Sequence, residues 1–383
     1  MTIAINRERL AATFTELCEI SSPSRKEGAI AVYLKEKFAG LGADILYEDN
    51  SAEKTGSESG NLIIRFNGNL PQQQGFFLSC HMDTVEPASD VRVLRVGDIF
   101  TSKGATILGG DDKSGIAAII ELLTMLKENS TPHPMLEIII TTCEEIGLLG
   151  AKHLEYDKLL TPYGYALDSC GIDQVIVGAP AANKIQVTIQ GLAAHAGLCP
   201  EAGINALSLT VAALNTLTMG RLDEESTRNF GVIQGGVATN IVPERVVLKG
   251  EVRSHSTEKL QAYTTEIYAA FDQTVASWQG SALTDSKRPS VTFDTIGDYP
   301  ALVLAEDSPV MQKIRKASAA IDKPLQYIVA GGGSDGNIFN GYGLPTAIIA
   351  TGMDKVHTVE EQLDLGDLVS LTELLHALAT TPA

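Results

Sequence analysis

The sequence of 383 residues has few cysteines for its length. The five cysteines are scattered and include no CxxC pair, which is typical of reduced thiols and argues against both a disulfide framework and a CxxC metal site. We therefore expect a cytoplasmic protein. The five cysteines are Cys18, Cys80, Cys143, Cys170 and Cys199.

Basic residues are also scarce, and long apolar runs are missing. Lys and Arg total 29 against 47 Asp and Glu, so the net charge is -18. This negative field repels nucleic acid and anionic lipid, which excludes both as expected partners. The first twenty residues carry charges where a signal peptide needs an apolar core, and no run is long enough to span a bilayer.

Apolar residues, at 44% of the chain, are ample for burial, and the length favours two domains. Strand-like and helix-like segments alternate up to about residue 180 and again after about residue 300. Among the helices, one is expected after a capping box at 24–27 and another at 359–378. The alternation predicts an α/β domain with a mostly parallel sheet between helices. Between these parts the order becomes β-α-β-β-α-β, which is the ferredoxin-like pattern. We expect a first domain at 1–180 and 299–383, with an inserted α+β domain at 181–298.

Acidic residues and histidines follow the predicted strands of the α/β domain in several places. Ligands of open α/β sheets collect at the carboxyl ends of strands, so these residues form a candidate site. The segments are SCHMD (79–83), GGDDKSG (109–115), TTCEEIG (141–147), ALDS (166–169) and KVHTVEE (355–361).

The first of these segments fits a metal ligand with a supporting carboxylate. Positions i and i+2 of an extended chain face the same way, so His81 and Asp83 can act together. His81 would bind a metal while Asp83 accepts a hydrogen bond from the other ring nitrogen.

Two segments carry adjacent acids. Asp111 or Asp112 could simply cap the helix expected from Ser114, but two acids exceed what a cap needs. Glu144 and Glu145 end a buried strand, where carboxylates are costly unless they meet cations. Adjacent acids point in different directions, so one can bind metal while the other handles protons.

Taken together, these motifs resemble the zinc-dependent exopeptidases and deacylases that include peptidase T, the glutamate carboxypeptidases and the aminoacylases. The segments GGDDKSGIA and CEEIGLLGAKHL look most similar to peptidase T and its relatives. The resemblance implies a zinc-exopeptidase fold in which the inserted domain is a lid and a homodimer surface. It also implies a two-metal hydrolase that cuts an amide bond in short peptides.

The resemblance also implies ligands for two Zn²⁺ per chain, which Co²⁺ or Mn²⁺ could replace because all donors are N or O. His81 and Asp168 would hold one metal, Glu145 and His357 the other, and Asp111 would bridge them. Each metal then has three protein ligands and an open position, as catalytic zinc requires.

The resemblance assigns further roles around the metals. Glu144 would be the general base, and Asp83 would support His81. The peptide bond between Asp111 and Asp112 is expected to be cis. The rival assignment makes Asp112 the bridge and leaves the bond trans.

Substrate contacts are expected from the inserted domain. His195 lies among residues too small to bury it, and by resemblance it stabilises the oxyanion, from the same or the partner subunit. Asn240 and Arg253 would contact the substrate, although a surface ion pair is the plain alternative for Arg253.

Three alternatives keep the chemistry and change the substrate: a carboxypeptidase, a dipeptidase and an N-acyl amino acid deacylase. A catalytically silent metal-binding or scaffold protein would lack Glu144 or a ligand, and all of these residues are present. The leading hypothesis is a tripeptide aminopeptidase.

Overall fold

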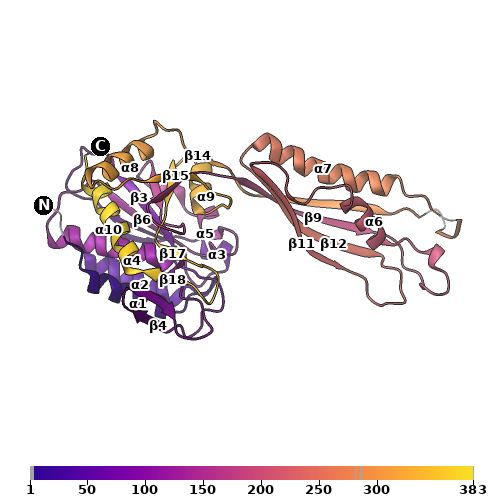
Figure 1. The fold of residues 1–383 in the computed structure, drawn as a ribbon, viewed down its shortest axis with the longest axis horizontal. Helices are drawn as coiled ribbons and strands as arrows, with labels where there is room; N and C mark the ends of the chain where they lie inside the picture. Colours follow the sequence, from indigo (N-terminus) through magenta and orange to yellow (C-terminus); the bar gives the residue numbers. More distant parts are fainter. Residues whose placement is uncertain (1–3, 281, 285–286, 383) are drawn as a thin grey trace. The chain divides into compact units, whose positions relative to one another are not determined.

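The computed structural model describes residues 4–280, 282–284 and 287–382, so the ends of the predicted first domain, residues 1–3 and 383, lie outside it (Figure 1). The chain forms two compact units. The outer unit comprises Met1–Gly178, Val303–Ala330 and Ser334–Ala383. The inserted unit comprises Ala179–Leu302 and Gly331–Gly333.

The outer unit is built on a sheet of nine strands. Its central strands β6, β3, β7 and β16 are neighbours and run parallel to one another. The order across the sheet is β1 (Ile45–Glu48), β2 (Leu62–Phe66), β6 (Leu136–Thr141), β3 (Phe76–His81), β7 (Gly164–Ala166), β16 (Thr346–Ile349), β8 (Gln174–Ala179) and β14 (Leu302–Val303), with β15 (Gln326–Val329) paired to β8.

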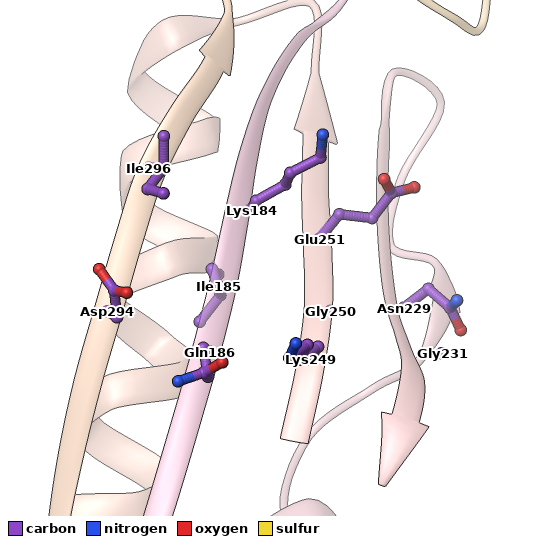
Figure 2. A pocket seen from close by; sticks show the side chains of 10 residues that line it. All are labelled: Lys184, Ile185, Gln186, Asn229, Gly231, Lys249, Gly250, Glu251, Asp294 and Ile296. Carbon is purple, nitrogen blue, oxygen red and sulfur yellow. The ribbon is translucent and has the colours of Figure 1, made fainter. Parts of the chain in front are cut away.

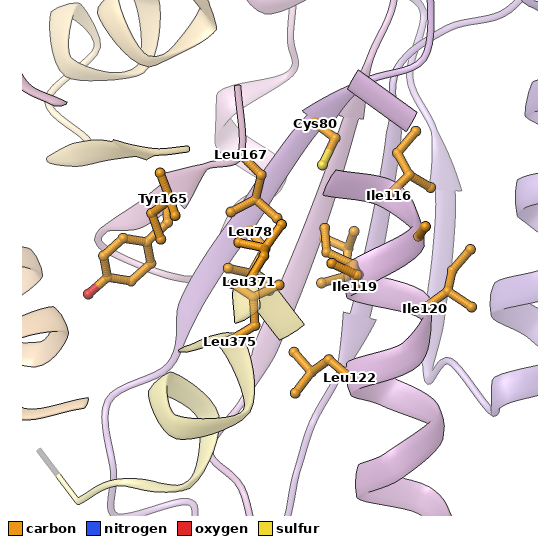
Figure 3. Packing of buried hydrophobic residues seen from close by; sticks show 14 of the residues in the cluster. Leu78, Cys80, Ile116, Ile119, Ile120, Leu122, Tyr165, Leu167, Leu371 and Leu375 are labelled. Carbon is orange, nitrogen blue, oxygen red and sulfur yellow. The ribbon is translucent and has the colours of Figure 1, made fainter. Parts of the chain in front are cut away.

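Helices cover both faces of this sheet. On β3, Leu78 and Cys80 belong to the large core that includes α4 and α10 (Figure 3). Phe77 points to the other face and contacts Phe339 of α9 edge-on, with ring centroids 5.3 Å apart. The predicted α/β fold is therefore confirmed. The helices of the outer unit are α1 (Arg7–Glu19), α2 (Gly28–Leu41), α3 (Ala52–Thr55), α4 (Gly110–Glu128), α5 (Leu149–Lys152), α8 (Pro309–Ala320), α9 (Asp335–Gly341) and α10 (Leu365–Thr380).

Helix α4 lies in the middle of this packing. Its segment 116–126 is apolar on nearly every side, as expected for a helix that is buried all round. Ile116, Ile119 and Leu122 lie in the core beside Leu371 and Leu375 of α10 (Figure 3). The beginning of α4 is consequently held in a fixed place at the edge of the sheet.

Two local predictions were wrong. A helix from Val359 is expected from the sequence, but Gln362–Asp364 forms β18 and the helix α10 begins at Leu365. Strand β18 pairs with the distant β5 (Ile99–Ser102) in a small sheet that includes β4 (Val93–Val96) and β17 (Met353–Asp354). A capping box at Ser24 is also expected, but α2 begins at Gly28 and the Ser24 hydroxyl donates to Asp83 Oδ2 at 2.6 Å.

The inserted unit has the ferredoxin-like arrangement. Its sheet runs β10-β11-β12-β9-β13, and the long strands are all antiparallel to their neighbours. Apolar residues of β9 and β12 pack with α6 and α7 into a second core. The elements are β9 (Ala181–Gln190), α6 (Ala206–Leu214), β10 (Gly220–Arg221), β11 (Ser226–Gly235), β12 (Arg245–Ser254), α7 (Thr257–Ala276) and β13 (Ser290–Tyr299).

The opposite face of this sheet is polar and open. Alternate residues of β9 and β12 point to it, because successive side chains of a strand face opposite ways. It carries a hollow of about 380 Å³, lined in part by Lys184, Lys249, Glu251 and Asp294 (Figure 2). None of the predicted site residues lines it.

Within the described residues, no helix combines the length and the apolar character that crossing a bilayer requires.

Candidate metal centre

The predicted ligands lie at one edge of the nine-stranded sheet. His81 is the last residue of β3, Glu145 follows β6, Asp168 follows β7 and His357 follows β16 along the chain. These four strands are parallel neighbours, so their carboxyl ends open on the same edge. The fold thus brings together residues that are 276 positions apart in sequence, from 81 to 357.

Asp111 reaches this edge from the first turn of α4. The backbone at Asp111 and Asp112 is not helical, and the peptide bond between them is cis, which confirms the prediction. The Asp112 carboxylate accepts a hydrogen bond from the backbone N–H of His81 at 3.3 Å. Asp111 is therefore the acid of this pair that faces the other candidate ligands.

The two oxygens of Asp111 face two different groups of side chains. Oδ1 lies 3.1 Å from His81 Nε2, and that nitrogen is 4.0 Å from Asp168 Oδ1. Oδ2 lies 3.2 Å from His357 Nε2, and that nitrogen is 3.1 Å from Glu145 Oε2. One carboxylate thus lies between two His–carboxylate pairs.

The contact between His81 and Asp83 differs from the expected one. His81 Nδ1 lies 2.9 Å from the backbone carbonyl oxygen of Asp83, and the nearer carboxylate oxygen is 3.6 Å away. The Asp83 carboxylate instead accepts the backbone N–H groups of Glu144 and Glu145, at 2.9 and 3.2 Å. Asp83 therefore supports the turn that carries these two acids as well as the imidazole.

Burial and crowding shift the ionisation of these groups. Burial and the nearby Asp111 charge raise the pKa of Asp168 to about 7. Burial, reinforced by Asp168, raises the pKa of Glu144 well above its usual value. Contacts with Asp111 and Glu145 raise the pKa of His357 to about 10. The chain alone does not balance this concentration of negative charge in a low-dielectric place, which a bound cation would do.

The side chains present fit a divalent metal. His81, Asp111 and Glu145 each offer one ligand atom, and these atoms lie within 4.8 Å of one another. Glu145 Oε1 is buried and has no hydrogen-bond partner among the described residues. Imidazole nitrogen and carboxylate oxygen are donors that suit zinc.

Two buried carboxylates near the site escaped the sequence reasoning. Glu361 accepts hydrogen bonds from the backbone N–H groups of Leu108, Gly109 and Asp111. Glu27 accepts the backbone N–H of Cys143, just before the two acids, at 3.1 Å. The only signal for Glu361 was its place in the KVHTVEE segment, and the only one for Glu27 was its place in the expected capping box at 24–27.

A third acid, Asp335, begins α9. It is 4% exposed, its Oδ2 accepts the Thr141 hydroxyl at 2.5 Å, and its Oδ1 has no partner among the described residues. Burial raises the pKa of Asp335 to about 6. Asp335 therefore adds a further acid at the end of β6.

The predicted substrate contacts lie in the inserted unit. His195 is exposed, and its backbone forms a bridge with Ile241. The next residue, Ala196, donates its N–H to the carbonyl of Asn240 at 2.9 Å, so His195 and Asn240 lie on neighbouring segments. Arg253 on β12 donates to Glu251 Oε2 at 3.2 Å. This is an ion pair of the kind given above as the alternative to a substrate contact.

Comparison with known proteins places the chain in a family. A model of the peptidase family M20/M25/M40 matches residues 77–381. The chain therefore belongs to this family of hydrolases, in agreement with the resemblance drawn from its motifs.

Similar proteins cover nearly the whole chain. It is 38% identical to the uncharacterized protein YqjE of Bacillus subtilis over 375 residues, 98% of each sequence. The crystal structure of the aminopeptidase PepT from Bacillus cereus matches with a TM-score of 0.89 and 34% identity, covering 98% of both chains. A tripeptidase from Staphylococcus aureus matches with a TM-score of 0.91 and 34% identity, again over 98% of both chains.

Proposed function

We propose that this peptidase is a two-metal aminopeptidase that removes the N-terminal residue of tripeptides and similar short peptides. The observation that carries the two-metal assignment is the placement of Asp111 between two His–carboxylate pairs. Such a placement is what a bridging ligand needs. The substrate class is supported by the aminopeptidase and tripeptidase that share 34% identity with the whole chain.

The distances support two ligand sets that share Asp111. His81 and Asp168 would hold one metal, and Glu145 and His357 the other, with Asp111 shared. Zinc is the metal we assign, and Co²⁺ or Mn²⁺ suits the same N and O donors. When bound, the metals supply Lewis acidity that activates water and polarises the scissile carbonyl.

The protein's own residues move the proton. Glu144 follows the same strand as Glu145 and is spare once the ligands are counted. Its carboxylate takes a proton from the attacking water and then gives it to the leaving amine nitrogen. Asp83 holds this turn through the backbone N–H of Glu144, so the position of the base is set by the fold.

The inserted unit would act as a lid. His195 is exposed on it and is free to donate to the developing oxyanion, whereas Asn240 and Arg253 would contact the substrate backbone or a carboxylate. A homodimer through this unit is supported by exposed apolar side chains on α6, Leu207 at 42% and Val211 at 56% exposure, one helical turn apart.

A panel of peptides tests the substrate class. Purified protein with added Zn²⁺ is incubated with di- and tripeptides, N-acetylated tripeptides and N-acyl amino acids, and the released amino acids are identified. We expect the N-terminal residue of free tripeptides to be released, and N-acetylation to stop this. Release of the C-terminal residue, or turnover confined to dipeptides or N-acyl amino acids, would replace the aminopeptidase assignment by the corresponding alternative.

A further inference from the structure

Glu361 is a charged side chain buried without a charged partner at hydrogen-bond distance among the described residues. It is 1% exposed, and burial raises its pKa. Its Oε2 accepts the N–H groups of Leu108 and Gly109 at 2.8 and 2.7 Å, and its Oε1 accepts that of Asp111 at 3.0 Å. Burying a carboxylate is costly, so three hydrogen bonds to one turn of backbone indicate a specific task.

The backbone that Glu361 contacts is the turn that leads into the shared ligand. Gly110 lies in the middle of this turn, and a Cβ added there would lie 3.1 Å from Glu361 Oε1. A side chain at this position would therefore crowd the carboxylate. The glycine thus lets Glu361 come close to the turn.

Glu361 is also hydrogen-bonded within the segment that carries His357. Its own N–H donates to the carbonyl of Thr358 at 3.1 Å, and the Thr358 hydroxyl donates to the carbonyl of Lys355 at 2.7 Å. These bonds close a compact turn around His357. A displacement of the Glu361 carboxylate would move this turn relative to Asp111.

We propose that Glu361 is a positioning residue that fixes the distance between His357 and Asp111, which stands at 3.2 Å between Nε2 and Oδ2. This inference rests on the proposed two-metal function. A ligand pair that is set before the metal arrives loses less freedom on binding, so the metal held by His357 binds more tightly. In this role Glu361 would act through the two ligands and would touch neither substrate nor metal.

The variant Glu361→Gln tests this role with little change in size. One carboxylate oxygen becomes an NH₂ group, so at least one of the three N–H groups then faces a donor. The matched control is Glu137→Gln. Glu137 is 0% exposed and also accepts the backbone N–H groups of two consecutive residues, Leu160 and Thr161. It differs in pairing with Arg65 and in holding no ligand segment.

The readout is the Kd for Zn²⁺ of the full chain after metal removal, measured by competition with a chromophoric chelator. Thermal unfolding of the metal-free chain is followed in parallel. We expect Glu361→Gln to raise the Kd of the weaker site about 10- to 100-fold, as loss of supporting hydrogen bonds does at other metal sites. Glu137→Gln should lower the unfolding temperature and leave both Kd values unchanged.

Three outcomes overturn the role. They are a wild-type Kd in folded Glu361→Gln, an equal loss of affinity in Glu137→Gln, and a loss of affinity on Glu360→Gln, which changes the exposed acid next door. If Glu361→Gln does not fold, Glu361→Asp keeps the charge and shortens the reach, with the same expected rise in Kd. A wild-type chain that binds no zinc would refute the proposed function itself, which separates the two failures.

Discussion

The ligand edge of the nine-stranded sheet and the open face of the five-stranded sheet both gather charged side chains, but most of those at the ligand edge are buried and most of those on the open face are exposed. At the ligand edge, His81, Asp111 and Glu145 have side chains 2%, 9% and 6% exposed, whereas the His357 side chain is 51% exposed. On the open face, Lys184, Lys249 and Asp294 are exposed, and Lys184 pairs at 2.8 Å with Asp298, whose side chain is 11% exposed. Buried charges without a paired cation are costly, whereas exposed or paired charges are not, so only the first set requires a function to explain it.

The comparison also separates two kinds of buried carboxylate within the outer unit. The carboxylate oxygens of Glu361 and Glu137 accept hydrogen bonds from backbone N–H groups, so these two side chains stabilise the fold itself. Glu145 keeps one buried oxygen without a partner among the described residues, and both oxygens of Asp111 face imidazoles. Carboxylates of the first kind hold backbone turns in place. Carboxylates of the second kind are the candidate metal ligands.

Glu144→Ala has the largest expected effect among single substitutions that leave the metals in place. Removal of a general base typically lowers turnover about 10²- to 10⁴-fold. Steady-state kinetics on a tripeptide should show this loss in kcat, while metal analysis and circular dichroism match the wild type. A metal-loaded variant with near-wild-type kcat would remove Glu144 from the mechanism.

His195→Ala has a smaller expected effect and links the inserted unit to the reaction. Loss of one donor to an oxyanion typically lowers kcat about 10²- to 10³-fold. Because His195 is exposed, its removal should leave the unfolding temperature unchanged. A change in KM alone would make His195 a binding residue, and unaltered kinetics would exclude it from the site.

Lys184→Ala has the smallest expected effect and tests the other side of the comparison. The Lys184 side chain is half exposed, so its ion pair with the largely buried Asp298 contributes about 1 kcal/mol, and urea unfolding should shift only slightly. Peptide hydrolysis should be the same as in the wild type. A clear loss of activity would show that the open face of the inserted unit takes part in function, contrary to the distinction drawn above.

Three of the candidate ligands could be predicted because each one lies at or just after the end of an apolar strand. His81, Glu145 and Asp168 stand directly after runs such as LEIIITT, and parallel strands end on one edge. The bridging choice between Asp111 and Asp112 needed the resemblance. The sequence Asp-Asp is the same whichever of the two side chains points towards the other ligands.

Apart from Asp83, the supporting residues could not be predicted, because long-range contacts define them. Glu360 and Glu361 are adjacent, yet one is exposed and the other is buried against residues 250 positions away. Ser24 fits a helix cap locally, but its hydroxyl bonds to Asp83. Gln362–Asp364 forms a strand only because Ile99–Ser102 lies beside it. The local sequence preference for helix, strand or turn holds no information about these distant partners.

The central claim is that Asp111 bridges two metals, and metal counting after loading and desalting tests it most directly. The wild-type chain should retain close to two equivalents of Zn²⁺, and a chelator should remove both the metal and the hydrolysis. In Asp111→Asn only one side-chain oxygen remains to bind two metals, so this variant should retain one equivalent of Zn²⁺ at most. A wild-type chain that is fully active without metal, or an Asp111→Asn variant that still holds two equivalents, would contradict the account.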